Sequence, residues 1–207
     1  MGKITGLEAV QDVPEKVRLL YRAVEELIAE GADVNNIRVL SITEKAGIGK
    51  GTAYDYFESK EELIACALVF YIRKSVEEIT AALSKKMSFT EQIELILDEI
   101  EQKNQNQQWF FHFVHIMTDN NEISRIVRDK IMEDKENGLS RNIFGEMIRE
   151  NKERGDIRKD VLEPYLVCSM FSRFMTYMIS VYMEDFFPID RPEMRSLVFR
   201  GIMEEFG

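Results

Sequence analysis

Three glycines within five residues, Gly47, Gly49 and Gly51, lie in the stretch ITEKAGIGKGTAYDYFESKEEL, which covers residues 42–63. Glycine inside a helix costs about 1 kcal/mol relative to alanine, so this spacing indicates a sharp turn or a backbone that a partner approaches closely. A helix that begins after such a turn presents unpaired N–H groups and a partial positive charge at its amino end. These groups suit a phosphate, so the chemistry that the stretch offers is the binding of a nucleic-acid backbone.

The elements around the glycines are short helices. Apolar residues at helical spacing predict one helix from about Arg38 to Ala46 and another from Lys50 to Phe57, with Ile48 filling the angle between them. An earlier helix is expected to open at Pro14 and to close near Gly31. Two short helices joined by a glycine-containing turn, with a first helix packed across them, are the parts of a helix-turn-helix DNA reader.

The rest of the chain shows the same helical period, and no segment alternates as a strand does. Ser59 with Glu62, and Ser88 with Glu91, are capping boxes that predict the starts of two further helices. An all-α fold with about nine helices is therefore expected. The later helices are predicted at 60–85, 88–100, 107–117, 122–154 with a break near 137–138, 163–187 and 193–206.

Composition is that of a globular protein in a reducing compartment. The 207 residues include only two cysteines, Cys66 and Cys168, without the spacing of a zinc site or a disulfide framework. No signal-peptide-like run opens the sequence and no stretch reaches the length of a membrane span. We expect a cytoplasmic protein without a cofactor.

Net charge is −10, which argues against nucleic acid as a partner when the chain is taken as a whole. Residues 34–60, however, carry four cations and three acids and are net positive by one charge. The acidic excess lies elsewhere in the chain, so the glycine-rich stretch remains a candidate DNA reader.

Several side chains of this stretch suit contacts with DNA. Lys50 and Thr52 lie at the leading end of the second short helix, where base edges are met, and Gly51 leaves its backbone open to DNA. Tyrosine hydroxyls and a lysine ammonium can bind phosphates, and an acid can accept from a cytosine amino group. Alternatively, the tyrosines are core residues and the acid faces solvent. The residues concerned are Tyr54, Tyr56, Lys60 and Asp55.

Residues 14–64, and above all AGIGKGTAYDYFESKEEL, resemble the N-terminal DNA-binding domain of TetR-family transcriptional regulators. The resemblance implies a DNA-binding domain over residues 1–65 and a helical ligand-binding and dimerisation domain over residues 66–207. It adds Arg38 and the N–H of Gly49 as phosphate contacts. Two positions depart from the family pattern, since Gly49 stands where a serine is usual and Ala53 where a larger aliphatic residue is common.

The resemblance also implies the partners. Residues 155–160 look like the loop that precedes the dimerising helix, and the helix after it has apolar residues on more than one side, so we expect a homodimer on a palindromic double-stranded operator. Some of a set of aromatic and methionine side chains are expected to line a cavity for a small, largely apolar ligand, although for any single one a place in the core is favoured. They are Trp109, Phe110, Phe113, Met117, Phe171, Phe174, Met175 and Met178.

Other functions find less support in the sequence. No nucleophile, metalloprotease or phosphate-loop motif indicates an enzyme. His112, His115 and Cys168 lack a fourth ligand of suitable spacing, so no metal site is predicted. The expected function is a repressor that a small molecule releases from DNA. The alternative is an activator, or a protein-interaction module without a ligand.

Overall fold

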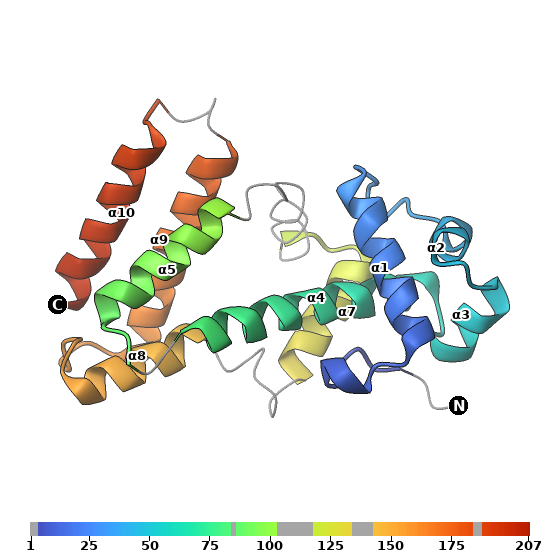
Figure 1. Ribbon diagram of the computed structural model, residues 1–207, viewed down its shortest axis with the longest axis horizontal. Coiled ribbons are helices and arrows are strands. Elements are labelled where there is room, and N and C mark those ends of the chain that lie inside the picture. Colours follow the sequence, from blue (N-terminus) through green and yellow to red (C-terminus); the bar gives the residue numbers. More distant parts are fainter. Residues whose placement is uncertain (1–3, 84–85, 103–117, 134–142, 184–187) are drawn as a thin grey trace. The chain divides into compact units, whose positions relative to one another are not determined.

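The computed structural model describes residues 4–83, 86–102, 118–133, 143–183 and 188–207 (Figure 1). All regular structure in these residues is helical, which confirms the predicted all-α fold. The elements are a 3-10 helix at Val10–Asp12 and α-helices α1 (Glu15–Ala29), α2 (Val39–Ala46), α3 (Lys50–Tyr56), α4 (Lys60–Ala82), α5 (Phe89–Gln102), α7 (Glu122–Glu133), α8 (Ile143–Arg154), α9 (Glu163–Tyr182) and α10 (Arg191–Phe206).

The chain folds as two compact units. The N-terminal unit comprises residues 1–76 and 108–140, and the C-terminal unit comprises residues 77–107 and 141–207. The chain therefore passes from one unit to the other three times, first within α4. The predicted boundary between residues 65 and 66 remains a prediction.

The N-terminal unit is built around α1. One stripe of α1 is buried at helical spacing, and α2 and α3 pack against it. Residues 63–70 of α4 are buried without exception, and α7 contributes Ile123 and Val127 to the same core. The buried residues of α1 are Val17, Leu20, Tyr21, Ala23, Val24 and Ile28, and Leu27 is half-buried.

The predicted capping box at Ser88 is complete, and the one at Ser59 is present in part, because the carboxylate of Glu62 binds the N–H of Glu58 instead of that of Ser59. The hydroxyl Oγ of Ser59 accepts from the N–H of Glu62 at 3.0 Å, and the carboxylate of Glu62 accepts from the N–H of Glu58 at 2.6 Å. Ser88 and Glu91 make the reciprocal pair, with N–H to carboxylate at 2.7 Å and N–H to hydroxyl at 3.3 Å. These caps pair backbone N–H groups that the first turn of a helix leaves without intrahelical partners, so the helices begin where the sequence predicts.

The C-terminal unit packs α5, α8 and α10 around α9. The sequence predicts apolar residues on more than one side of α9, and the structure shows which side faces the core: Tyr177 is fully buried, whereas Phe171 is 45% exposed. An apolar helix surface fits more than one register, so only packing decides which stripe faces the core. The buried stripe comprises Leu166, Met170, Phe174, Tyr177 and Val181.

Helix boundaries differ modestly from the predictions. The described part of α9 ends at Tyr182, and the rest of the predicted segment to residue 187 lies mostly outside the described residues. The last helix begins at Arg191, two residues before the predicted Glu193, because Pro192 lies in its first turn. Proline is tolerated there since the N–H it lacks would have no intrahelical partner.

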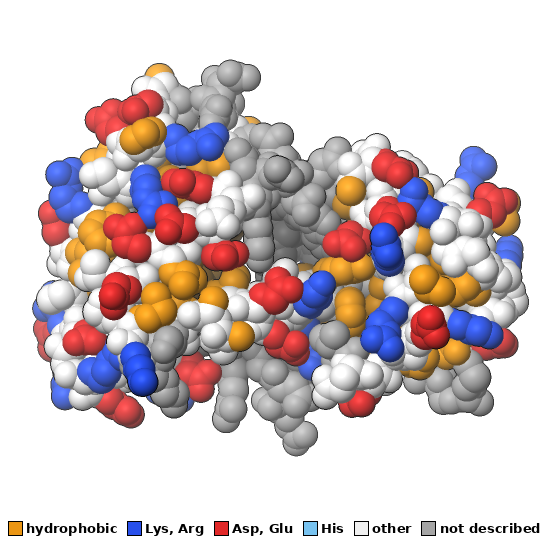
Figure 2. Space-filling model, in the orientation of Figure 1, with side chains coloured by type: hydrophobic (Ala, Val, Ile, Leu, Met, Phe, Trp, Pro, Cys, Tyr) orange, Lys and Arg blue, Asp and Glu red, His pale blue; other side chains and the backbone are white. Residues whose placement is uncertain are grey.

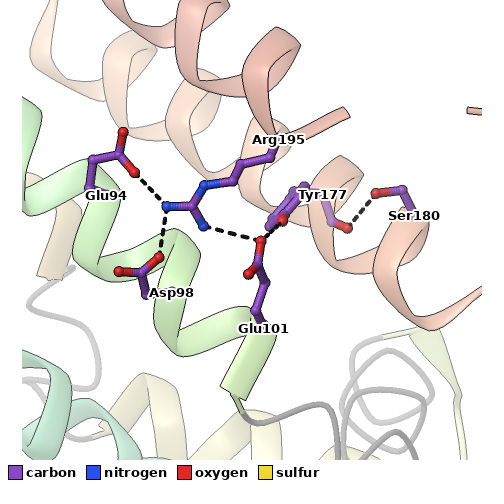
Figure 3. A network of polar contacts seen from close by, with 6 residues as sticks. All are labelled: Glu94, Asp98, Glu101, Tyr177, Ser180 and Arg195. Atoms are coloured by element: carbon purple, nitrogen blue, oxygen red, sulfur yellow. Dashed lines mark hydrogen bonds and ion pairs between the residues drawn. The ribbon is translucent and has the colours of Figure 1, made fainter. Parts of the chain in front are cut away.

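A polar cluster ties three helices of this unit together (Figure 3). The guanidinium of Arg195 on α10 donates to three carboxylates of α5, with 2.7 Å to Asp98 and 3.1 Å to Glu101. Glu94 is the third acceptor, and the hydroxyl of Tyr177 on α9 also donates to Glu101. Burial alone would raise the pKa of Glu101, but the hydrogen bonds from Tyr177 and Arg195 outweigh it and hold this pKa below its usual 4.5. The stability that this carboxylate contributes is thus present above pH 4.5 and lost as the pH falls through the lowered pKa.

Asn151 of α8 holds the turn that leads into α9. Its amide donates to the side-chain oxygen of Gln92 on α5 at 2.7 Å and to the carbonyl of Met147 at 2.6 Å. The backbone carbonyl of Asn151 accepts from the N–H of Asp156 at 2.9 Å. Asp156 directly follows Gly155, whose φ is +88°. Since Asn151 is fully buried and Gln92 is 2% exposed, neither amide can replace its partner with water.

We predict that Asn151→Leu lowers the free energy of unfolding by about 1–3 kcal/mol, because the buried side-chain oxygen of Gln92 loses its donor. Urea unfolding followed by circular dichroism measures the change. The double variant Asn151→Leu, Gln92→Leu is expected to recover part of the loss, since both polar partners are then removed. A double variant less stable than the sum of the two single changes would contradict this account.

Candidate nucleic-acid interface

The turn between α2 and α3 has the predicted glycine geometry. Gly47 adopts φ +65°, a left-handed conformation that residues with side chains rarely take, and this agrees with the sharp turn that the glycine spacing indicates. The turn is closed by hydrogen bonds from the N–H of Gly47 to the carbonyl of Glu44 at 3.1 Å and from the N–H of Ile48 to that of Thr43 at 2.9 Å. Ile48 is half-buried against the core of the unit, as expected for a residue that fixes the angle between two helices.

The amino end of α3 begins at an open backbone. Gly49 precedes the helix with an extended conformation, φ −66° and ψ 142°, and no side chain caps the helix there. Cβ atoms at Gly49 and Gly51 would have no neighbour within 4 Å, and both residues are exposed. The free protein therefore has room for side chains at both positions, so these glycines are not needed for packing within it.

The side chains of α3 divide cleanly between two faces. Lys50, Tyr54 and Asp55 are exposed, and Thr52 is half-buried. Ala53 and Tyr56 face the core, with 1% and 5% exposure. The ring of Tyr56 therefore packs in the core, which agrees with the alternative that the tyrosines are core residues. Tyr54, at 39% exposure, lies on the open face.

Two of the four cations in this region already have partners. The Lys45 ammonium lies 2.7 Å from Glu30 and 3.7 Å from Glu26 of α1, and the hydrogen bond to Glu30, against a smaller effect of burial, raises its pKa. The Lys60 ammonium lies 3.3 Å from Glu61 and donates to the carbonyl of Asn35 at 3.1 Å. These contacts fix α2 against α1 and α4 against the loop before α2.

Arg38 and Lys50 remain available. Neither has an ion pair within the described ranges, and both are exposed, Arg38 as the residue that precedes α2. The ammonium of Lys50 lies 5.8 Å from the ring centre of Tyr54, one turn further along α3. The face drawn in Figure 2 carries basic side chains interspersed with acidic ones and no continuous basic patch.

The sequence of this region matches a known protein family. Residues 19–66, which include all of α2 and α3, match the family model described as "Bacterial regulatory proteins, tetR family". Residues 19–66 therefore belong to the TetR family of bacterial regulatory proteins. The resemblance found in residues 14–64 is thereby confirmed.

Solved structures share the TetR-family fold over nearly the whole chain. FadR from Bacillus subtilis in complex with stearoyl-CoA matches with a TM-score of 0.70 and 17% identity, covering 92% of this chain and 99% of that one. FadR from Bacillus halodurans matches with a TM-score of 0.70 and 18% identity, covering 93% of this chain and 96% of that one. A TetR transcription regulator from Haloarcula marismortui matches with a TM-score of 0.65 and 15% identity, covering 92% of this chain and 96% of that one. A comparison with curated proteins found no match.

The residues predicted to line a ligand cavity are only partly placed. Trp109, Phe110, Phe113 and Met117 lie outside the described residues, as do His112 and His115. Phe174 is buried and stacks on Phe144 with ring centres 5.5 Å apart, whereas Phe171 lies on the exposed side of α9. Met175 and Met178 are half-buried. Their roles in ligand binding stay predictions.

Two further observations bear on the sequence-based expectations. Both cysteines are free thiols, Cys66 buried and Cys168 exposed. Among the described residues, no helix has the length and apolar character that a membrane span requires. Sequence reasoning missed the segment before α1, where the N–H of Ile4 donates to the carbonyl of Tyr56 at the end of α3, at 3.2 Å. No local pattern could have predicted a contact between residues so far apart in the chain.

Replacement by alanine should change the free energy of unfolding in opposite directions at Gly47 in the turn and at Gly51 in α3. Gly51→Ala is expected to raise the free energy of unfolding by up to about 1 kcal/mol, because it improves helix propensity at an open position. Gly47→Ala is expected to lower it by about 1–2 kcal/mol, because its φ of +65° strains a residue with a Cβ. Thermal or urea unfolding of the two variants tests this. Equal destabilisation by both would show that Gly51 has a structural role.

Proposed function

We propose that the chain is a ligand-responsive repressor that binds a palindromic operator as a homodimer in the cytoplasm and leaves it when a small apolar ligand binds. The observation that carries the DNA-binding part is the division of α3, which anchors itself by Ala53 and Tyr56 and turns Lys50, Gly51, Tyr54 and Asp55 outward. A short helix with an open, glycine-containing face, positioned by a rigid turn, suits insertion into the major groove.

The proposed DNA contacts follow from exposure and chemistry. Arg38 and Lys50 are the cations available for phosphates, and the Tyr54 hydroxyl is a further phosphate donor on the same helix. Thr52 and Asp55 are the candidates for base edges, while the bare backbone at Gly49 and Gly51 permits close approach. Lys60 and Tyr56 keep secondary places, since Lys60 is ion-paired and the Tyr56 ring is buried.

The proposed dimer uses the exposed apolar side of α9 and α10. Large apolar side chains are exposed there, and such surfaces usually mark contacts with a partner. The carboxylate of Glu205 on α10 accepts from Ser169 Oγ at 2.6 Å and Arg173 Nη2 at 2.7 Å on α9, so the two helices are held to one another. The exposed residues are Leu162 at 77%, Tyr165 at 58%, Phe171 at 45% and Leu197 at 40%. A two-fold dimer would place two copies of α3 on successive half-sites.

The class of ligand rests on less direct support. The structure of FadR from Bacillus subtilis contains stearoyl-CoA, a molecule with a long apolar chain. At 17% identity the likeness is one of fold, so we take from it only the class of ligand to test first. An activator that needs no ligand would present α3, the proposed reading helix, in the same way. A reporter gene placed behind the operator separates the two, because a repressor lowers expression and an activator raises it.

Salt dependence of DNA binding tests the proposed phosphate contacts. Duplexes with inverted repeats, selected by the protein from a random pool, serve as probes. Lys50→Ala and Arg38→Ala are each expected to reduce the slope of log K against log salt by about 0.9, because each removes one phosphate contact. Fluorescence anisotropy at several salt concentrations measures the slope.

Lys45→Ala is the matched control, because Lys45 lies in the same region but is already paired with Glu30 and Glu26. Its slope should equal that of the unmodified protein. If Lys45→Ala and Lys50→Ala reduce the slope equally, the effect is one of net charge and the assigned contacts are wrong. If no duplex is enriched at all, the proposed function falls.

A charge placed on the exposed side of α9 should separate the dimer. Phe171→Asp is expected to halve the mass found by sedimentation at micromolar concentration, because an interface that buries this ring would then bury a carboxylate. Met132→Asp on α7, where the methionine is 70% exposed, is the control and should leave the mass unchanged. An unmodified protein that sediments as a monomer would contradict the dimer itself.

A further inference from the structure

The segment before α1 lies tightly on α4. We define residues 4–13 as the N-terminal strap, whose ends Ile4 and Val13 are 8% and 2% exposed. Gly6 has φ +81°, and a Cβ there would lie 3.0 Å from Sγ and 3.1 Å from Cα of Cys66. The strap therefore passes over α4 with no space for a side chain at Gly6.

Three hydrogen bonds attach the strap to three different helices. The N–H of Ile4 donates to the carbonyl of Tyr56, the last residue of α3, at 3.2 Å. Arg73 Nη1 of α4, at 7% exposure, donates to the carbonyl of Glu8 at 3.0 Å. The ammonium of Lys130 on α7 donates to the carbonyl of Thr5. One short segment thus connects the reading helix with α4 and α7.

The strap is also held within itself. The carboxylate of Glu8 accepts from the N–H groups of Thr5 at 2.7 Å and Gly6 at 2.9 Å. Burial alone would raise the pKa of Glu8, but these hydrogen bonds outweigh it and hold the pKa below its usual value. Residues 5–8 therefore form a closed loop, and a displacement at Thr5 is passed along the strap instead of being absorbed by a loose chain.

The position of α7 in the chain gives this connection its significance. α7 packs with Ile123 and Val127 in the core of the N-terminal unit, although 45 residues separate its start at Glu122 from the first 76 residues of the chain. The segments on either side of its part of the unit, residues 77–107 and 141–207, belong to the C-terminal unit. α7 therefore joins this core through the folded structure and not through proximity in the sequence.

The Cys66 thiol beneath the strap offers no competing role as a reactive group. It is fully buried, and burial raises its pKa to about 12, against the smaller opposing effect of Lys130. A thiol rather than a thiolate is present at neutral pH, so oxidation or alkylation is not favoured. Tyr21, Glu8 and Glu62 are the other titratable groups close to this thiol, and the two acids further disfavour the thiolate.

We infer that Lys130 is a positioning residue for the reading helix and that the N-terminal strap carries its effect from α7 to the end of α3. In this arrangement Lys130 fixes Thr5, and Ile4, the next residue, fixes the carbonyl of Tyr56. The use of this connection in regulation rests on the proposed function. Its existence as a mechanical coupling does not, because every contact lies within the N-terminal unit.

Hydrogen exchange of the full-length chain tests the coupling without DNA or ligand. Lys130→Met removes the donor to Thr5 while keeping a long helix-forming side chain. We expect amide exchange to become about two- to tenfold faster both in residues 4–8 and in residues 53–57, the range that loss of one hydrogen bond gives. Lys16→Met, at an exposed lysine of α1, is the matched control and should change neither segment.

A second variant approaches the coupling from the strap itself. Gly6→Ala is expected to accelerate exchange in residues 53–57 as Lys130→Met does, because both the positive φ and the contact with Cys66 oppose a Cβ. Faster exchange confined to residues 4–8 in both variants, or equal acceleration of residues 53–57 by Lys16→Met, would overturn the inference. If the coupling is observed but no duplex is bound, the proposed function fails and this inference stands.

Discussion

The burial of α4 from Leu63 to Phe70 is the constraint on which the N-terminal unit depends. A surface helix buries one stripe, but all eight of these residues are buried, so this part of α4 must be covered on every side. Burial of a large apolar side chain contributes about 1.5–3 kcal/mol, so exposing even one face of this segment would be costly. The cover includes α1, the N-terminal strap over Cys66, and the apolar residues of α7. The reading helix is therefore supported by elements that lie far from it in sequence.

The same constraint separates what the sequence could predict from what it could not. The turn, the reading helix and the helix starts were predictable because their causes are local: Gly47 must take a positive φ, and Ser59 and Glu62 lie three residues apart. The strap and the docking of α7 were not predictable, because Thr5 and Lys130 are joined only by the folded core. The inward face of α9 was not predictable for a related reason. Where a helix is apolar on several sides, as at Phe171 and Tyr177, periodicity does not single out one face.

Charge in the reading region illustrates a second limit of sequence reasoning. A count of cations over residues 34–60 treats Lys45 and Lys60 as equal to Lys50, yet the structure uses the first two to hold α1, α2 and α4 in place. Ion pairs at such exposure contribute little stability, so their main effect here is to remove positive charge from the surface. With two unpaired cations in the described part of this region, recognition of DNA would depend on hydrogen bonds and close backbone approach more than on long-range attraction. The acidic balance of the whole chain is compatible with that kind of reader.

In the C-terminal unit, directional contacts fix α10 at both ends. Arg195 near its start meets the carboxylates of α5, and near its end Glu205 meets α9 while the carbonyl of Phe206 accepts from the N–H of Arg158 at 2.9 Å. Apolar packing is non-directional and would allow α10 to slide or rotate on α9 at little cost. Partly buried ion pairs lose hydration that offsets much of their attraction, so these contacts select one arrangement more than they add stability. The proposed dimer would depend on that selection, because a rotation of α10 by even one side-chain position would replace the apolar Leu197 with the neighbouring Ser196.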